Sequence, residues 1–402
     1  MNNFFLNRFY IIIFLITISC ENKSFISEDI LNIDELSVVS SNEMKFSTYQ
    51  ITPSIGNSEI ISVGNKGLFK NLTTFIEFKD YHQHEILNMK IDSALIKIKF
   101  LNNQNLDYLQ SEDLSLGFIE KPIEYDELTT NYDNISWLND AYYKINSNVE
   151  IDSNGLNDLV FNLDSNFIAM LSDSTFKPLF ILEELYNEDE ILSFYSSNDV
   201  SNKPFLNLFT SSDSDTSYDS SFVIDAFSDV TIFEYPKLNE EFLDSNLNYL
   251  SIGAGLNTII KPTFENLALP NTASIIKANL NIEIDTLIAL DSLTINFQAF
   301  SLEDSVINWN WGEVMMQDPY NSISNIFSQS LVSSIENSTL SLDITNYIQS
   351  IISQRLINGN ILVNTGLKID IINSNSLFDI VVFKNNSNSN DNIHLDIFYE
   401  NN

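Results

Sequence analysis

The chain has 402 residues, of which 44% are hydrophobic, and 55 acidic residues against 19 basic ones give a formal net charge of −36. This length suits two or three domains, and the apolar content excludes a chain that is disordered throughout. The negative charge excludes nucleic acid as a partner, because binding it requires Lys and Arg to displace counterions. It also disfavours binding to anionic lipid headgroups through the protein surface.

The N-terminus carries an export signal. Arg8 precedes the apolar run "FYIIIFLITI" (9–18), which is too short to span a bilayer but fits a secretory signal. The following "TISC" ends on Cys20, the only cysteine, and resembles a bacterial lipobox, although Thr17 stands where that pattern usually has Leu. The resemblance implies cleavage before Cys20 and its lipidation.

We therefore expect a signal peptide over 1–19 and a lipidated acidic tether over 20–44. The protein would be exported and held at the outer membrane or cell surface through the Cys20 lipid alone. An ordinary signal peptide with an incidental cysteine is the alternative.

After the tether, short apolar runs alternate with Asn, Asp and Ser, as in "LTTFIEF" (72–78) and "LSLGFI" (114–119). In "IDSALIKIKF" (91–100), the side chains of Ala94, Ile96, Ile98 and Phe100 fall on one face of an extended chain. This period of two predicts a half-buried strand, and the repeated short runs predict an all-β sandwich or barrel.

The same pattern returns as "IIKANLNIEI" (275–284), with Ala278 matching Ala94. Further matches follow in the same order: "SVGN" (62–65) with "SIGA" (251–254), "FNLDSNFIAML" (161–171) with "LDITNYIQSII" (342–352), and "PFLNLF" (204–209) with "IHLDIF" (393–398). The chain is therefore predicted to be a tandem duplication. We place the domains at 45–210 and 222–402, joined by the polar linker "SSDSDTSYDSS" (211–221).

The isoleucines of 342–352 have helical spacing, which predicts a short amphipathic helix there and another over "FIAML" (167–171).

The order of these motifs resembles the DNRLRE-type modules, a family of secreted jelly-roll domains that includes carbohydrate-binding modules. The match includes "SIGNSEIISVG" (54–64), "ISWLND" (135–140) and "INWNWGE" (307–313). It departs from the family in "LTTFIEF", which lacks the usual arginine, and in the aliphatic residues that replace a tryptophan after the family's "DVT" stretch. The resemblance implies an all-β fold of two tandem jelly-roll β-sandwich domains, each with a short helix. A structural calcium ion, whose ligands it does not specify, is also compatible with it.

Glycan-binding sandwiches stack sugar faces on exposed aromatic rings, which makes the tryptophans candidate ligand-binding residues. Trp309 and Trp311 lie two apart and would share one face of a strand. Trp137 matches Trp309 in the repeat, which favours a common packing role, whereas Trp311 has no counterpart and is the stronger candidate. Tyr142 and its neighbour Tyr143 are weaker candidates. The alternative for each tryptophan is burial in a core.

Metal binding and catalysis find little support. The histidines of "YHQH" (81–84) lack an assignable third ligand, and "DSDTSYD" (213–219) fails the EF-hand pattern because Tyr218 and Ile224 occupy its sixth and twelfth positions. No G-x-S-x-G, H-E-x-x-H or P-loop motif is present. We predict no catalytic residues, no metal site and no cofactor.

The expectation is a non-catalytic lipoprotein that binds an extracellular ligand, namely a polysaccharide or a cell-surface partner. A structural or adhesion protein that uses its sandwiches as spacers or docks is the alternative, and a polysaccharide-degrading enzyme is the third.

Overall fold

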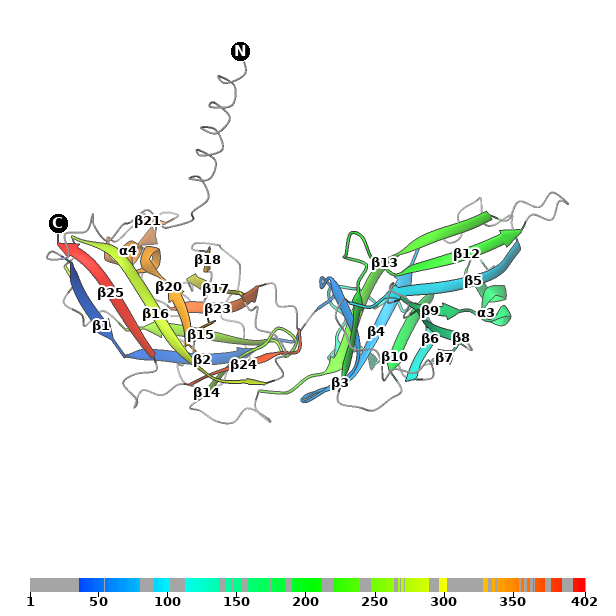
Figure 1. Ribbon diagram of the computed structural model, residues 1–402, viewed down its shortest axis with the longest axis horizontal. Coiled ribbons are helices and arrows are strands. Elements are labelled where there is room, and N and C mark those ends of the chain that lie inside the picture. Colours follow the sequence, from blue (N-terminus) through cyan, green and yellow to red (C-terminus); the bar gives the residue numbers. More distant parts are fainter. Residues whose placement is uncertain are drawn as a thin grey trace, which may run out of the picture.

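The structure is a computed structural model. It describes residues 36–401 with gaps at 54, 80–89, 102–112, 137–141, 146–147, 153–157, 172, 174, 185–189, 212–219, 239–246, 264–266, 268, 271, 289–295, 302–327, 332–334, 337–338, 354–355, 358–359, 362–363, 365, 373–376 and 385–392. The described chain is dominated by antiparallel strands, which form two lobes (Figure 1) and confirm the predicted all-β sandwich class. No helix among these residues is long and apolar enough to cross a membrane.

One lobe, here called module A, is built from eleven strands and a short helix. Its elements are β3 (Ile60–Lys66), β4 (Phe69–Phe78), β5 (Lys90–Lys99), β6 (Leu114–Glu120), β7 (Tyr143–Lys144), β8 (Asn148–Asp152), β9 (Asp158–Asn162), α3 (Ser165–Leu171), β10 (Pro178–Glu184), β11 (Ile191–Tyr195), β12 (Phe205–Ser211) and β13 (Ser220–Glu234). The strand order is β7-β6-β10-β4-β13-β12-β5-β9-β8, with β3 pairing both β4 and β11. The long β13 joins the two faces of the sandwich, because its first part pairs with β12 and its second part with β4.

The other lobe, module B, repeats this arrangement. It contains β1 (Ser37–Ser41), β2 (Met44–Gln50), β14 (Leu247–Leu250), β15 (Leu256–Pro262), β16 (Ala273–Ile288), β17 (Asn296–Ser301), β18 (Ser328–Leu331), β19 (Ile335–Glu336), β20 (Thr339–Asp343), α4 (Thr345–Ile352), β21 (Leu356–Ile357), β22 (Asn360–Ile361), β23 (Leu367–Ile372), β24 (Ile380–Lys384) and β25 (Ile393–Asn401). One sheet has the order β1-β25-β16-β20-β19, with β24 pairing β14 and the far end of β16, and a second has the order β18-β17-β23-β15-β2.

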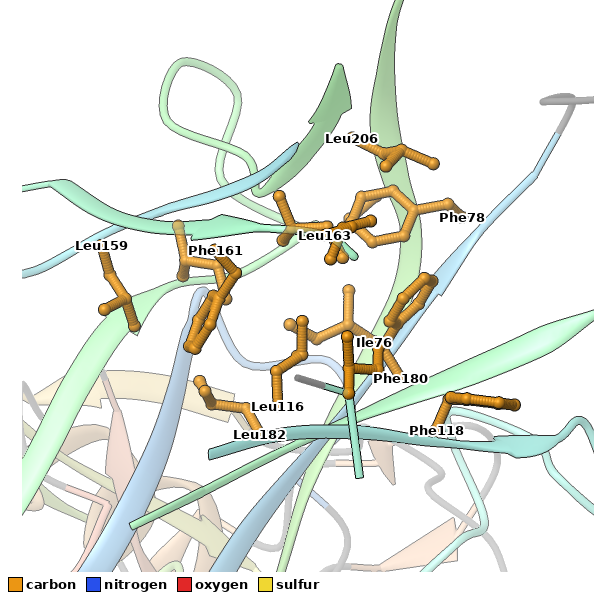
Figure 2. Packing of buried hydrophobic residues seen from close by; sticks show 14 of the residues in the cluster. Ile76, Phe78, Leu116, Phe118, Leu159, Phe161, Leu163, Phe180, Leu182 and Leu206 are labelled. Carbon is orange, nitrogen blue, oxygen red and sulfur yellow. The ribbon is translucent and has the colours of Figure 1, made fainter. Parts of the chain in front are cut away.

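The repeat predicted from the sequence is confirmed in the strand registers. Ala94 of β5 lies opposite Leu208 of β12, and Ala278 of β16 lies opposite Ile397 of β25. The inner faces of β5 and β16 are buried as the alternation predicts, and both helices form at the predicted segments. Figure 2 shows the core of module A, where Phe180 and Leu182 of β10 and Leu159 and Phe161 of β9 are among the packed side chains.

The predicted domain boundaries are wrong, because the modules exchange their first strands. Strands β1 and β2 pair with β25 and β15 of module B, although they precede module A in the chain. Strand β13 pairs with β12 and β4 of module A, although most of it falls in the predicted second domain. Residues 37–41 are therefore a strand and not tether. The stretch 211–221 does not link the modules, because Thr210 and Ser220 face each other where β12 and β13 pair.

A small apolar core lies where the two modules meet. Phe69 and Phe233 of module A pack against Phe378 of module B, with ring centroids 5.3 and 5.2 Å from that of Phe378. The same cluster includes buried Leu238 and Tyr249. Because these aromatic rings are removed from water only when both modules are in place, they fix one module against the other.

Candidate functional site

Most of the residues that the sequence analysis considered as lipidation, ligand or metal sites lie outside the described residues. These are Cys20, Trp137, Trp309, Trp311, the two histidines of 81–84 and the aspartates of 213–219. Tyr142 is described, and its neighbour Tyr143 lines a cleft of module A. Among the described residues, no group of three or more His, Cys, Asp or Glu side chains is placed to hold a metal ion.

This cleft lies between the edge of a sheet and helix α3. Among the described strands, β7 is the last of its sheet and pairs only with β6, with Phe118 facing Tyr143 and Gly117 facing Lys144. The cavity has a volume of about 510 Å³ and is lined by Phe118, Glu120, Tyr143, Lys144, Ile145, Asp164, Asn166, Phe167, Met170 and Phe176. A volume of this size is typical of small-ligand sites.

Aromatic rings form the floor of the cleft. The Phe118 ring is in edge contact with Phe176 at 5.4 Å and packs at 4.9 Å against Phe167 of α3. The Tyr143 ring stacks on Phe118 with centroids 5.4 Å apart and an interplanar angle of 21°, yet Tyr143 remains 58% exposed. The buried phenylalanines therefore hold an open tyrosine ring in a fixed orientation.

The rim of the cleft is polar. Glu120, Lys144 and Asn166 are exposed. Asp164 accepts a hydrogen bond from the backbone N–H of Phe167 at 2.8 Å, which satisfies one of the free donors at the start of α3. Stacking and hydrogen bonding are thus the interactions that the lining offers to a ligand.

Tyr142 points to the opposite side of the edge strand from Tyr143. Its ring covers Gly117, where an added Cβ would stand 2.3 Å from the Tyr142 ring. Its hydroxyl donates to Glu183 on β10 at 3.1 Å. Burial raises the pKa of Tyr142 to about 12, and the Glu183 carboxylate adds to the rise, so the phenol stays protonated at physiological pH. Tyr142 therefore covers the sheet, while its neighbour faces the cleft.

The outer face of β5, which carries Lys97 and Lys99, forms a second depression of about 300 Å³ in module A. Lys97 is paired with Asp158 at 2.5 Å, and Lys99 donates to Asn202 at 2.8 Å. Both lysine ammonium groups therefore already bond to protein side chains, which makes this depression a weaker candidate for a ligand-binding site than the cleft beside α3.

Comparison with known proteins does not assign a family. No family model matches the chain. No curated protein matches it. Among solved structures, it is similar to domains D2 and D3 of the major pilin SpaD from Corynebacterium diphtheriae, with 8% identity and a TM-score of 0.19, over 77% of this chain and 80% of that chain. At that TM-score the likeness supports no conclusion, and the sandwich description rests on the strand pairings above.

Proposed function

We propose that the protein is a non-catalytic, lipid-anchored cell-surface protein that binds an extracellular polysaccharide, with the cleft of module A as a binding site. The observation that carries this proposal is the exposed Tyr143 ring, which is fixed on buried Phe118 inside an open cleft. Sugar rings present apolar C–H faces that stack on such an aromatic surface, and the polar rim is placed to bond their hydroxyls. The net charge of −36 favours neutral over anionic glycans.

A glycan array with the lipid-free protein tests this proposal. Tyr143→Ala removes the stacking ring and is expected to weaken binding about tenfold, since one aromatic contact is worth roughly 1 kcal/mol beyond its buried area. Tyr132→Ala is the matched control, because Tyr132 is another exposed tyrosine, 38% accessible, in a separate segment. If the wild type binds no glycan at millimolar concentration, or if both variants bind equally, the proposed site is wrong.

Two further parts of the proposal have their own measurements. Trp311→Ala in the same array tests the predicted ligand contact in module B, which should change binding independently of Tyr143. Intact-mass analysis of membrane-extracted protein should show an acyl modification that disappears in Cys20→Ser. An unmodified mass for the wild type would refute the anchor.

The structural or adhesion role is supported by a different observation, the aromatic contact between the modules. A fixed pair of sandwiches suits a spacer. Under this alternative, glycan binding would be absent while the rigid shape persists after any change in the cleft.

A further inference from the structure

The strands that the two modules exchange are equivalent elements of the repeat. Strands β1 and β2 precede the first repeat, and β13 precedes the second. In module A, β13 lies between β12 and β4. In module B, β1 lies against β25 and β2 against β15, which are the repeat counterparts of β12 and β4. Each module is therefore completed by the leading strand of the other repeat.

Buried threonines bond the leading strand of the other repeat in the same way in both modules. In module A, Thr74 on β4 donates to the carbonyl of Ser62 at 2.8 Å. The Ser62 N–H donates at 2.9 Å to Thr231, which β13 supplies.

In module B, Thr258 on β15 donates to the carbonyl of Tyr249 at 2.8 Å. The Tyr249 N–H donates at 3.1 Å to Thr48, which β2 supplies. These two hydrogen bonds are the same in both modules, and in each module the accepting threonine hydroxyl comes from the exchanged strand.

The exchanged segment β1–β2 is an integral part of module B. Phe46 is 2% exposed and Tyr49 is fully buried. Gln50 is also buried, and its side chain bonds to the connection that leads back from module A: Nε2 donates to Pro236 O at 2.8 Å, and Oε1 accepts from Leu238 N at 2.9 Å. Without β1–β2, module B would expose the edge of β15 and part of its core.

The two exchanged segments, β13 and β1–β2, differ in how they are connected to the rest of the chain. β13 is followed by β14 and preceded by β12, with which it pairs directly, so it stays beside module A if it detaches. Among the described residues, β1–β2 is joined to the rest of the chain through residues 51–59, on its C-terminal side. If β1–β2 leaves module B, it cannot pair with module A of the same molecule, because β13 already occupies the equivalent position between β12 and β4. A vacant acceptor of matching register then exists in module B of a second molecule.

We propose that β1–β2 is exchanged between copies of this chain, so that two molecules complete each other's module B in a reciprocal dimer. The contacts in the dimer are those already present in the monomer, and only the connection 51–59 changes its path. Dimer formation loses translational freedom and the contacts of this connection, among them the burial of Ile55 between the modules, so it depends on protein concentration. A second copy is the partner that the register of the acceptor strands specifies.

Cross-linking between positions that face each other across β2 and β15 tests the exchange. Lys45 and Lys261 are directly opposed, and Lys45 is exposed. In a Cys20→Ser background the chain has no other cysteine. A chain with Lys45→Cys is mixed with a chain with Lys261→Cys, and the two are unfolded together, refolded at high concentration and oxidised. A heterodimer joined between positions 45 and 261, identified by mass spectrometry, is expected to increase about in proportion to concentration.

The matched control uses two opposed positions on the corresponding strands of module A. Lys70 and Glu234 face each other across β4 and β13, and a mixture of Lys70→Cys with Glu234→Cys chains is expected to form far less heterodimer. The double variant Lys45→Cys/Lys261→Cys should close within one chain when diluted. The proposal is overturned if this double variant closes while the mixed chains yield no heterodimer above the control. It is also overturned if the double variant does not close, because β2 then does not lie on β15.

Discussion

A buried carboxylate on the exchanged strand β13 makes the stability of module A depend on pH. Asp229 is 1% exposed, and its Oδ2 accepts a hydrogen bond from the Ser197 backbone N–H. Its Oδ1 is buried and has no hydrogen-bond partner within the described structure. Burial raises the pKa of Asp229 to about 7, and the nearby Glu127 carboxylate adds to the rise. Burial also raises the pKa of Glu127 itself.

The sign of the effect follows from proton linkage. Folded Asp229 keeps its proton up to about pH 7, whereas the unfolded residue loses it near the ordinary aspartate pKa of 3.8. Between these two values the folded state binds more protons, so the free energy of unfolding falls as the pH rises. The displacement of about three pKa units corresponds to roughly 4 kcal/mol above pH 7, at 1.36 kcal/mol per unit.

Asp229→Asn removes this titration. The variant and the wild type should have similar free energies of unfolding near pH 4, and the variant should be more stable by roughly 2–4 kcal/mol at pH 8. Urea unfolding followed by far-UV circular dichroism from pH 4.5 to 8.5 measures the difference. Asp225→Asn changes an exposed carboxylate of the same strand and should remain within about 0.5 kcal/mol of the wild type. Parallel pH profiles for the wild type and Asp229→Asn would refute the reasoning.

Two other substitutions test packing at the edges of the modules. Gln50→Ala leaves the Leu238 N–H and the Pro236 carbonyl without their partner, so it should lower the free energy of unfolding in urea by about 3 kcal/mol. Lys45→Ala, on the same strand, is the control and should lower it by less than about 0.5 kcal/mol. A loss below about 1 kcal/mol for Gln50→Ala would contradict this account. Gly117→Ala should displace the Tyr142 ring and lower the free energy of unfolding by about 1–3 kcal/mol. In a Tyr142→Ala background most of that loss should vanish. Additive losses in the double variant would show that the ring does not press on Gly117.

The candidate cleft shows where local sequence is ambiguous. Adjacent residues of a strand point to opposite sides, so Tyr142 and Tyr143 could not both face one site. The sequence carries no signal for which of them lies outward, because that depends on what each side of the edge strand meets. Here Gly117 leaves room for one ring, and α3 with Phe118 forms a cleft beside the other. The cleft also combines residues from β6, β7 and α3 that are distant in the chain.

By itself, the sequence determined the all-β class, the buried faces of the repeated strands, the two short helices and the duplication. A period of two places Ala94 and Ile96 inward whatever strand lies beside them, and the same holds for Ala278 and Leu280. It did not determine which repeat each leading strand joins. The segments 37–50 and 220–234 have similar apolar patterns and offer a threonine at the same place, so either fits either acceptor locally. The tertiary structure decided the pairing, because partner choice depends on the path of the connections and on the contacts between modules, and neither is written in the local pattern.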